Sequence, residues 1–272
     1  MGGDANRVLD GKVSDRPLYI EIEHASKAFG EGQKRNVVLR DFSLDVRKGE
    51  FLTFFGPNGC GKTTLLNVIV GVESLDEGSV KMNGGTSRPR VGYVFQDYRG
   101  YLMPWLTVAE NIAFPLRIRG VSKPERMSKV EAVVARFQFR IDLGAYTYAL
   151  SGGQAQLTSI LRALILDPDI LIMDEPFSAL DYQTNLSLYE KVLQIWEATG
   201  VTILLVSHDI DEAIYLGERT VFLTKRPANV AAVLESKLPA QKELTQMGSE
   251  AFASMKKQAL EIFRREALEK SA

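Results

Sequence analysis

The chain contains 272 residues, of which 45% are hydrophobic and 25% are charged, and its formal net charge is −1. This length allows one large α/β domain with an insertion or two small domains, and the near-neutral charge excludes a broad basic field for nucleic acid. No apolar stretch reaches membrane-spanning length, and a single cysteine, Cys60, excludes a disulfide framework within the chain and suits a reducing compartment.

Residues 1–16 are polar and lack the apolar segment of a secretory signal, so we expect a flexible leader. Two segments then alternate apolar and polar residues, which predicts strands: Leu18, Ile20 and Ile22, followed by Phe42, Leu44 and Val46. Because an apolar, parallel-type strand follows at 51–55, we expect a small antiparallel sheet beside an α/β core.

The apolar run 51–55 ends in a glycine-rich loop and then an amphipathic helix. The loop is Gly56-Pro57-Asn58-Gly59-Cys60-Gly61-Lys62-Thr63-Thr64. It fits the phosphate-binding pattern G-x-x-x-x-G-K-[ST]. Glycines let consecutive backbone N–H groups face an anion, and the helix N-terminus adds positive charge. Lys62 can reach the β- and γ-phosphates and Thr63 can bind Mg²⁺. A plain glycine-rich turn is the alternative, but the strand–helix context favours nucleoside triphosphate binding.

Short strands are predicted at 80–82 and 91–95, and the second ends at Gln96. An amide at a strand end can bind Mg²⁺ and hydrogen-bond the attacking water, although a plain turn residue explains Gln96 equally well. From there to residue 149 strand signals are few, and helical spacing appears near 108–116 and 130–139. This stretch therefore predicts a helical insertion.

A second possible anion site begins at Leu150-Ser151-Gly152-Gly153-Gln154, which precedes a helical segment. An ordinary N-cap explains Ser151 but not the glycine pair followed by Gln154. After this helix, a buried strand at 170–173 ends in Asp174 and Glu175. A carboxylate there, beside a phosphate loop, can hold Mg²⁺, and its neighbour can act as general base or position a water. The alternatives are a strand-ending acid and an exposed loop acid.

A helix is predicted at 183–199 and a strand at 202–206, which ends in Ser207 and His208. A neutral imidazole there can hydrogen-bond the γ-phosphate or the attacking water, whereas a capping or solvated histidine is the alternative. Phe29, in a loop before the core, can stack on a purine, although a loop phenylalanine is more often a core plug. Closing strands are expected at 220–224 and 230–234, and the tail from 249 predicts a helix that packs on its own domain.

Strands that alternate with helices predict a mostly parallel sheet, whose carboxyl strand ends share one edge. We therefore expect Gly56, Gln96, Asp174, Glu175 and His208 to converge there.

Taken in order, these motifs resemble those of the nucleotide-binding subunit of ATP-binding-cassette (ABC) transporters. The resemblance covers about residues 18–240, and it includes Ser178-Ala179-Leu180-Asp181 between the acid pair and His208. It implies a P-loop NTPase core at 17–95 and 156–240, a helical signature subdomain at 96–155 and a C-terminal helical extension at 241–272. It also implies an ATPase that uses Mg²⁺, with Phe29 at the family's adenine-stacking position.

The resemblance further implies a head-to-tail dimer, a homodimer or a pair with another ATPase subunit. Each ATP would lie between one phosphate loop and the partner's signature, where Ser151 and Gly153 would bind the γ-phosphate and Asp181 would sit at the interface. One departure is that Ala155 and Leu157 replace basic residues that the family usually carries after the signature, so we expect altered chemistry at the helix surface.

The residues from Tyr101 to Val108 resemble the corresponding sequence of importer subunits, and so do Glu175-Pro176-Phe177-Ser178. Arg226-Pro227 and Leu238-Pro239 are similar to subunits that serve nitrate, sulfonate, taurine and bicarbonate uptake. The implied partners are a permease that docks near Gln96–Trp105 and, through the complex, a solute-binding protein, at the cytoplasmic face of the membrane. Trp105 and Leu106 could instead fill the insertion's own core. Other functions left open are an export or lipid-trafficking subunit and a non-transport ABC ATPase.

Overall fold

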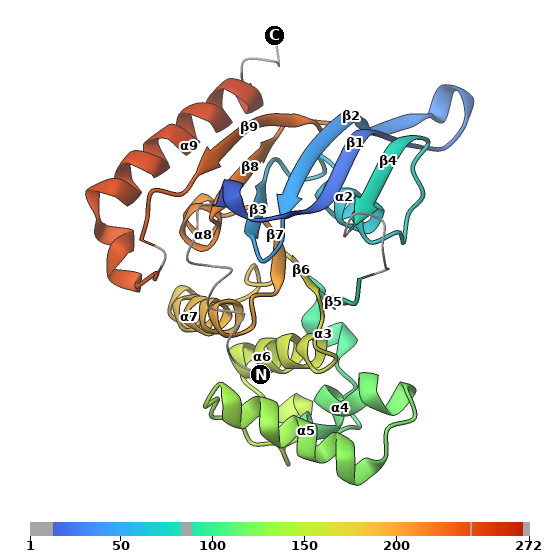
Figure 1. The fold of residues 1–272 in the computed structure, drawn as a ribbon, viewed down its shortest axis with the longest axis vertical. Coiled ribbons are helices and arrows are strands. Elements are labelled where there is room, and N and C mark those ends of the chain that lie inside the picture. Colours follow the sequence, from blue (N-terminus) through green and yellow to red (C-terminus); the bar gives the residue numbers. More distant parts are fainter. Residues whose placement is uncertain (1–12, 83–88, 240, 269–272) are drawn as a thin grey trace. The chain divides into compact units, whose positions relative to one another are not determined.

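A computed structural model describes residues 13–82, 89–239 and 241–268 (Figure 1). Its contacts form two units, one made of Met1–Pro89 with Trp196–Ala272 and the other of Arg90–Ile195. The leader predicted over 1–16 falls outside the described residues as far as residue 12. Val13–Asp15 form a short 3-10 helix and Arg16 is buried. The leader prediction is therefore wrong for residues 13–16.

The first unit contains the small antiparallel sheet that the sequence predicts (Figure 1). Its order is β2-β1-β4, with β1 at Leu18–Phe29, β2 at Asn36–Arg47 and β4 at Glu77–Met82. Alternating apolar side chains point into the core, and Ile22 pairs with Leu44 across β1 and β2. The strand predicted at 80–82 is the third member of this sheet rather than part of the parallel core.

A second set of strands in the first unit carries the phosphate loop. Its order is β7-β3-β8-β9, with β3 at Phe51–Phe55, β7 at Thr202–Ser207, β8 at Arg219–Leu223 and β9 at Val230–Glu235. β3 is parallel to both of its neighbours, and β9 is antiparallel to β8. β3 and β7 are buried along their whole length, as expected for strands covered on both faces. The alternation of strands and helices thus gave the correct fold class.

Three helices of the first unit are α2 at Lys62–Ile69, α8 at Ile210–Leu216 and α9 at Glu250–Leu268. α8 escaped prediction because it is only seven residues long, although Asp209 caps it by accepting hydrogen bonds from two backbone N–H groups. The predicted tail helix is confirmed, and α9 buries Phe252, Met255 and Ala259. The ring of Phe263 also lies edge-on to Phe55, with centroids 5.3 Å apart.

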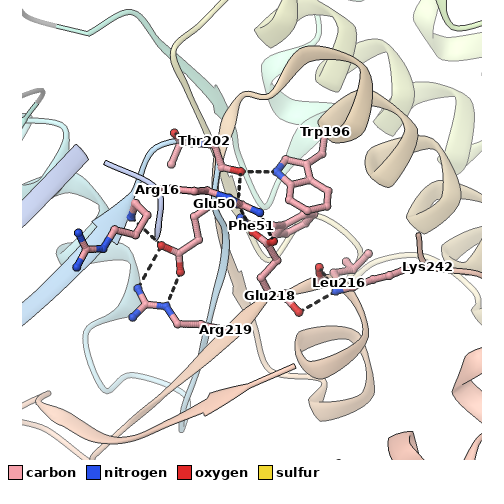
Figure 2. Close-up of polar contacts among 12 residues, drawn as sticks. Arg16, Glu50, Phe51, Trp196, Thr202, Leu216, Glu218, Arg219 and Lys242 are labelled. Carbon is pink, nitrogen blue, oxygen red and sulfur yellow. Dashed lines mark hydrogen bonds and ion pairs between the residues drawn. The ribbon is translucent and has the colours of Figure 1, made fainter. Parts of the chain in front are cut away.

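A network of charged and polar side chains lies around the start of β3 (Figure 2). Arg16 forms two hydrogen bonds of 2.7 Å to Glu218, and Arg219 pairs with the buried Glu50. Lys242, in the segment after β9, donates 2.8 Å hydrogen bonds to the carbonyl oxygens of Leu216 and Gly217 at the end of α8. These contacts join residues that are far apart in the sequence, so they hold the two ends of the first unit together.

The second unit combines two parallel strands with helices. Its elements are β5 at Val91–Val94, α3 at Tyr98–Tyr101, α4 at Val108–Ile118, α5 at Lys123–Arg136, α6 at Gly152–Leu164 and β6 at Ile170–Asp174. α7, at Tyr182–Thr199, begins here and ends in the first unit. The helical stretch predicted after Gln96 is confirmed, except that α5 starts earlier than residue 130, with Pro124 in its first turn.

Candidate functional site

The glycine-rich loop joins β3 to α2 in the first unit, as predicted. Gly61 has a φ of +121°, and a Cβ there would lie 2.6 Å from a methyl carbon of Val38, so only glycine fits. The Lys62 ammonium is buried and donates to the carbonyl oxygens of Gly56 and Pro57, at 3.0 and 3.1 Å. The loop therefore already encloses the cation that would face a phosphate.

Thr63 is exposed in the first turn of α2, and the neighbouring Asn58 and Gly59 are also exposed. Cys60 is buried, and burial raises the pKa of its thiol. The cysteine therefore stays protonated at neutral pH and packs as a small apolar side chain. The role of the Thr63 hydroxyl as a metal ligand stays a prediction.

His208 lies at the same end of the strands as the phosphate loop. Phe55, the last residue of β3, pairs with Ser207, the last residue of β7, in parallel register. Gly56 and His208 each follow one of these residues, and the His208 side chain is exposed. Within the first unit, the structure thus brings the loop and the histidine together at the carboxyl edge, as the sequence predicts.

Phe29 is the last residue of β1, and 40% of its surface is exposed. This exposure contradicts the alternative in which Phe29 plugs the core. An exposed ring leaves a face available for an aromatic partner.

In the second unit, Gln96 and Glu175 lie at neighbouring strand ends. Val94 of β5 pairs with Met173 of β6 in parallel register, and each polar residue follows two positions later. The Gln96 amide nitrogen donates a 3.1 Å hydrogen bond to a carboxylate oxygen of Glu175. Glu175 also has a φ of +46°, a conformation rare for residues other than glycine, which turns the chain sharply after the strand.

Asp174, the last residue of β6, is only 6% exposed. Burial and then the charge of Asp174 raise the pKa of the Tyr93 hydroxyl on the adjacent strand. A carboxylate oxygen is a ligand type that Mg²⁺ prefers, so Asp174 has the chemistry of a metal ligand.

The Ser151–Gln154 segment starts α6 with a reciprocal capping box. The Ser151 hydroxyl accepts from the backbone N–H of Gln154, and the Gln154 side chain accepts from the backbone N–H of Ser151. A Cβ on Gly152 would lie 2.6 Å from a methyl carbon of Leu180, and one on Gly153 would lie 2.6 Å from a methyl carbon of Thr184. Capping and close packing therefore explain all four residue types, a structural reason that the sequence alone did not supply.

Asp181 precedes α7 and holds Thr184 beside this helix start. Its carboxylate accepts hydrogen bonds from the hydroxyl and backbone N–H of Thr184, at 2.6 and 2.9 Å. These bonds keep the pKa of Asp181 below its usual value. A cavity of about 320 Å³ beside the helix start is lined by Ser151, Gly153 and Gln154 and also by Arg140 and Lys191. The two cations make this face suitable for an anion, and sequence reasoning overlooked both.

Ala155 and Leu157, the departures after the signature, are both buried. The expected change in surface chemistry is therefore wrong, because these positions contribute to the core of the second unit. Arg162, farther along α6, donates to the backbone oxygen of Tyr101 and lies 5.4 Å from the centre of the Phe114 ring.

The segment after Gln96 exposes aromatic side chains. Trp105 is 71% exposed, which contradicts the alternative in which it fills the core, and Tyr101 stacks on Phe95 with ring centres 4.0 Å apart. The buried side chain of Asn111 bonds backbone groups of Met103, Leu106 and Thr107 and so fixes the loop. Thr107 caps α4 with Glu110, and their three-residue spacing was a sequence signal for this arrangement.

The predicted site residues thus fall into two groups. The first unit holds Phe29, Gly56–Thr64 and His208, and the second holds Gln96, Ser151–Gln154, Asp174, Glu175 and Asp181. The single edge that we expect for all of them stays a prediction, and so do the subdomain boundaries at residues 96, 156 and 241. None of the helices in the described ranges is long and apolar enough to span a membrane.

Comparisons with known proteins agree with these motifs. Residues 39–178 match the family model described as ABC transporter. The aliphatic sulfonates import ATP-binding protein of Bacillus cereus is 38% identical, over 91% of this chain and 97% of its own. The taurine import ATP-binding protein of Pseudomonas aeruginosa is 39% identical, over 78% of this chain and 81% of its own.

A solved dimeric ATP-binding cassette, in a post-hydrolysis state with ADP and Pi, is 28% identical to this chain. The match has a TM-score of 0.69 and covers 81% of this chain and all of that one. The family model, the relatives and this likeness all point to one assignment. The chain belongs to the ABC transporter family, as an ATP-binding subunit that hydrolyses ATP.

Proposed function

We propose that this ATPase powers the import of a small anion through a separate membrane permease. The observation that carries the proposal is the similarity over most of the chain to relatives named as import ATP-binding proteins. The hydrogen bond from Gln96 to Glu175, which places an amide and a carboxylate at adjacent strand ends, supports the ATPase chemistry. The names of the two relatives support sulfonates or taurine as the solute class. Nitrate and bicarbonate belong to the same group of resembling subunits.

In this proposal, the backbone of residues 56–64 and the Lys62 ammonium bind the ATP phosphates. The Thr63 hydroxyl, the Gln96 amide and the Asp174 carboxylate would hold Mg²⁺, because their oxygen atoms are the ligands that this hard cation prefers. The chemistry that a bound Mg²⁺ would supply there is neutralisation of the charge on the phosphates. Glu175 orients the attacking water and takes its proton, and His208 hydrogen-bonds the γ-phosphate.

The proposed assembly is a head-to-tail dimer, homodimeric or paired with another ATPase subunit. The start of α6 at Ser151 and Gly153 binds the γ-phosphate of the partner's ATP, and Asp181 lies at the interface. The cations beside this helix start and the dimeric form of the solved cassette support this arrangement. Closure with ATP and opening after hydrolysis then shift a conformational equilibrium.

The proposed permease contact is the segment Gln96–Trp105. The exposed rings of Tyr101 and Trp105 support it, because large exposed aromatics mark interaction surfaces. A cavity of about 150 Å³ beside Tyr101 and Phe95 can receive one side chain of a permease helix. The subunit would thus sit at the cytoplasmic face of the membrane, with a solute-binding protein joined through the complex.

The Lys62→Ala variant tests the nucleotide site, because this substitution removes the ammonium that the loop encloses. We expect binding in isothermal titration to be lost, whereas the exposed Lys81→Ala serves as a control with normal binding. Retained micromolar affinity in Lys62→Ala would exclude the loop assignment.

Transport direction is tested by reconstituting the subunit with its permease and measuring ATPase activity. Stimulation of this activity by a solute-loaded binding protein supports import. No stimulation excludes the proposed import function.

A further inference from the structure

The ring of Phe29 has a cation on one of its faces. Lys27 and Phe29 lie two residues apart at the end of β1, where the pairing with β2 shifts register between Lys27 and Ala28. The Lys27 ammonium lies 5.1 Å from the centre of the Phe29 ring, within the range of a cation–π interaction. Lys27 is only 8% exposed, whereas Phe29 is 40% exposed. In this pair the ammonium is therefore buried, and the ring is the part that a ligand can contact.

Two carboxylates from the segment after α2 hold the ammonium in place. Oxygen atoms of Glu73 and Asp76 each lie 3.8 Å from the Lys27 nitrogen. Asp76 is itself fixed, because its carboxylate accepts a 2.7 Å hydrogen bond from the backbone N–H of Ala28 and its own N–H donates to the Ser26 oxygen. The segment that follows α2 is thus bonded to the end of β1, which carries Phe29.

We propose that Lys27 is a positioning residue for the adenine base of ATP and that it acts through Phe29. The inference rests on the proposed role of Phe29 as the stacking surface. The ammonium holds the ring in one orientation, which lowers the entropy lost when a base stacks on it. A positive charge behind the ring also draws electron density from its open face, which favours stacking with an electron-rich purine.

A purely structural role of Lys27, as the partner of Glu73 and Asp76, makes a different prediction. A structural ion pair would stabilise the strand end whatever ligand is bound, and its loss would affect phosphate binding as much as base binding. A residue that acts through the Phe29 ring affects only ligands that carry a base. Its effect also disappears when the ring is removed.

The experiment measures ATP and tripolyphosphate dissociation constants of the full chain by isothermal titration. The variants are Lys27→Met, Lys27→Arg, Phe29→Ala and the double variant. We expect Lys27→Met to weaken ATP binding about fivefold, and Lys27→Arg to restore it because a guanidinium also stacks on aromatic rings. In the Phe29→Ala background, Lys27→Met adds no further loss, and tripolyphosphate binding is unchanged throughout.

Several outcomes overturn the proposal. Equal losses from Lys27→Met with and without the Phe29 ring, or an equal loss for tripolyphosphate, assign Lys27 to a structural ion pair. Unchanged ATP affinity in Phe29→Ala would show that the ring does not stack on the base, and the inference would then fail. Failure of the unmodified chain to bind ATP would instead overturn the nucleotide site itself. If Lys27→Met does not fold, Lys27→Gln, which keeps a polar end beside the two carboxylates, replaces it in the same cycle.

Discussion

The Gln96 amide and the Glu175 carboxylate are joined by a 3.1 Å hydrogen bond. If Glu175 accepts the proton of the attacking water, Glu175→Gln keeps the size of the side chain and removes the base. We expect the turnover number to fall by about 100-fold or more, while ATP binding persists. ATPase assays measure the first effect, and an ATP-dependent dimer peak in size-exclusion chromatography measures the second. Normal turnover in this variant would exclude Glu175 as the base.

A methyl group at Gly153 should destabilise the start of α6. The new Cβ would lie 2.6 Å from a methyl carbon of Thr184, and Thr184 cannot rotate freely because its hydroxyl is bonded to Asp181. We expect Gly153→Ala to lower the free energy of unfolding by about 1–2 kcal/mol in urea denaturation. Gly248→Ala is the matched control, because a Cβ there meets no atom within 4 Å. Equal stabilities of the two variants would show that Thr184 moves aside at no cost.

Removal of Arg219 should leave a buried charge without its main partner. Glu50 is fully buried, and burial raises the pKa of its carboxyl while Arg219 opposes this shift. We expect Arg219→Met to lower the free energy of unfolding by about 3 kcal/mol. Adding Glu50→Gln removes the unpaired charge and should recover part of this loss. A double variant no more stable than Arg219→Met would contradict the account.

The free energy of unfolding should rise with pH because Lys242 loses its proton more easily in the folded chain than in the unfolded chain. Desolvation lowers the pKa of this group to about 7, although Glu218 and Glu197 oppose the shift. Between pH 7 and the ordinary lysine value, the unfolded chain binds more protons, so the free energy of unfolding increases with pH. We expect a gain of about 2 kcal/mol from pH 7 to 9. Lys242→Met should reduce this slope in denaturant titrations, and an unchanged slope would assign it to other groups.

Local patterns in the sequence predicted much of the fold. Glycine, lysine and threonine at fixed spacing identify a phosphate loop because each residue type has one physical role there. The apolar runs of β3, β6 and β7 are short and buried, so the sequence alone predicts where they end. Glu175 and His208 follow the ends of β6 and β7, and Gln96 follows β5.

Contacts between distant segments could not be predicted in this way. Arg16 follows a polar leader, and nothing near it indicates its pairing with Glu218. Lys27 resembles any solvated lysine of a strand until Glu73 and Asp76 are placed around it. The buried environment of Ala155 likewise depends on how α6 packs, which periodicity alone did not resolve.

The edge-to-face contact between Phe263 and Phe55 links the tail of the chain to the residue that precedes Gly56. α9 thereby acts as a brace for the strand that carries the phosphate loop. Loss of the Phe263 ring would therefore leave the end of β3, directly before the loop, without this packing contact.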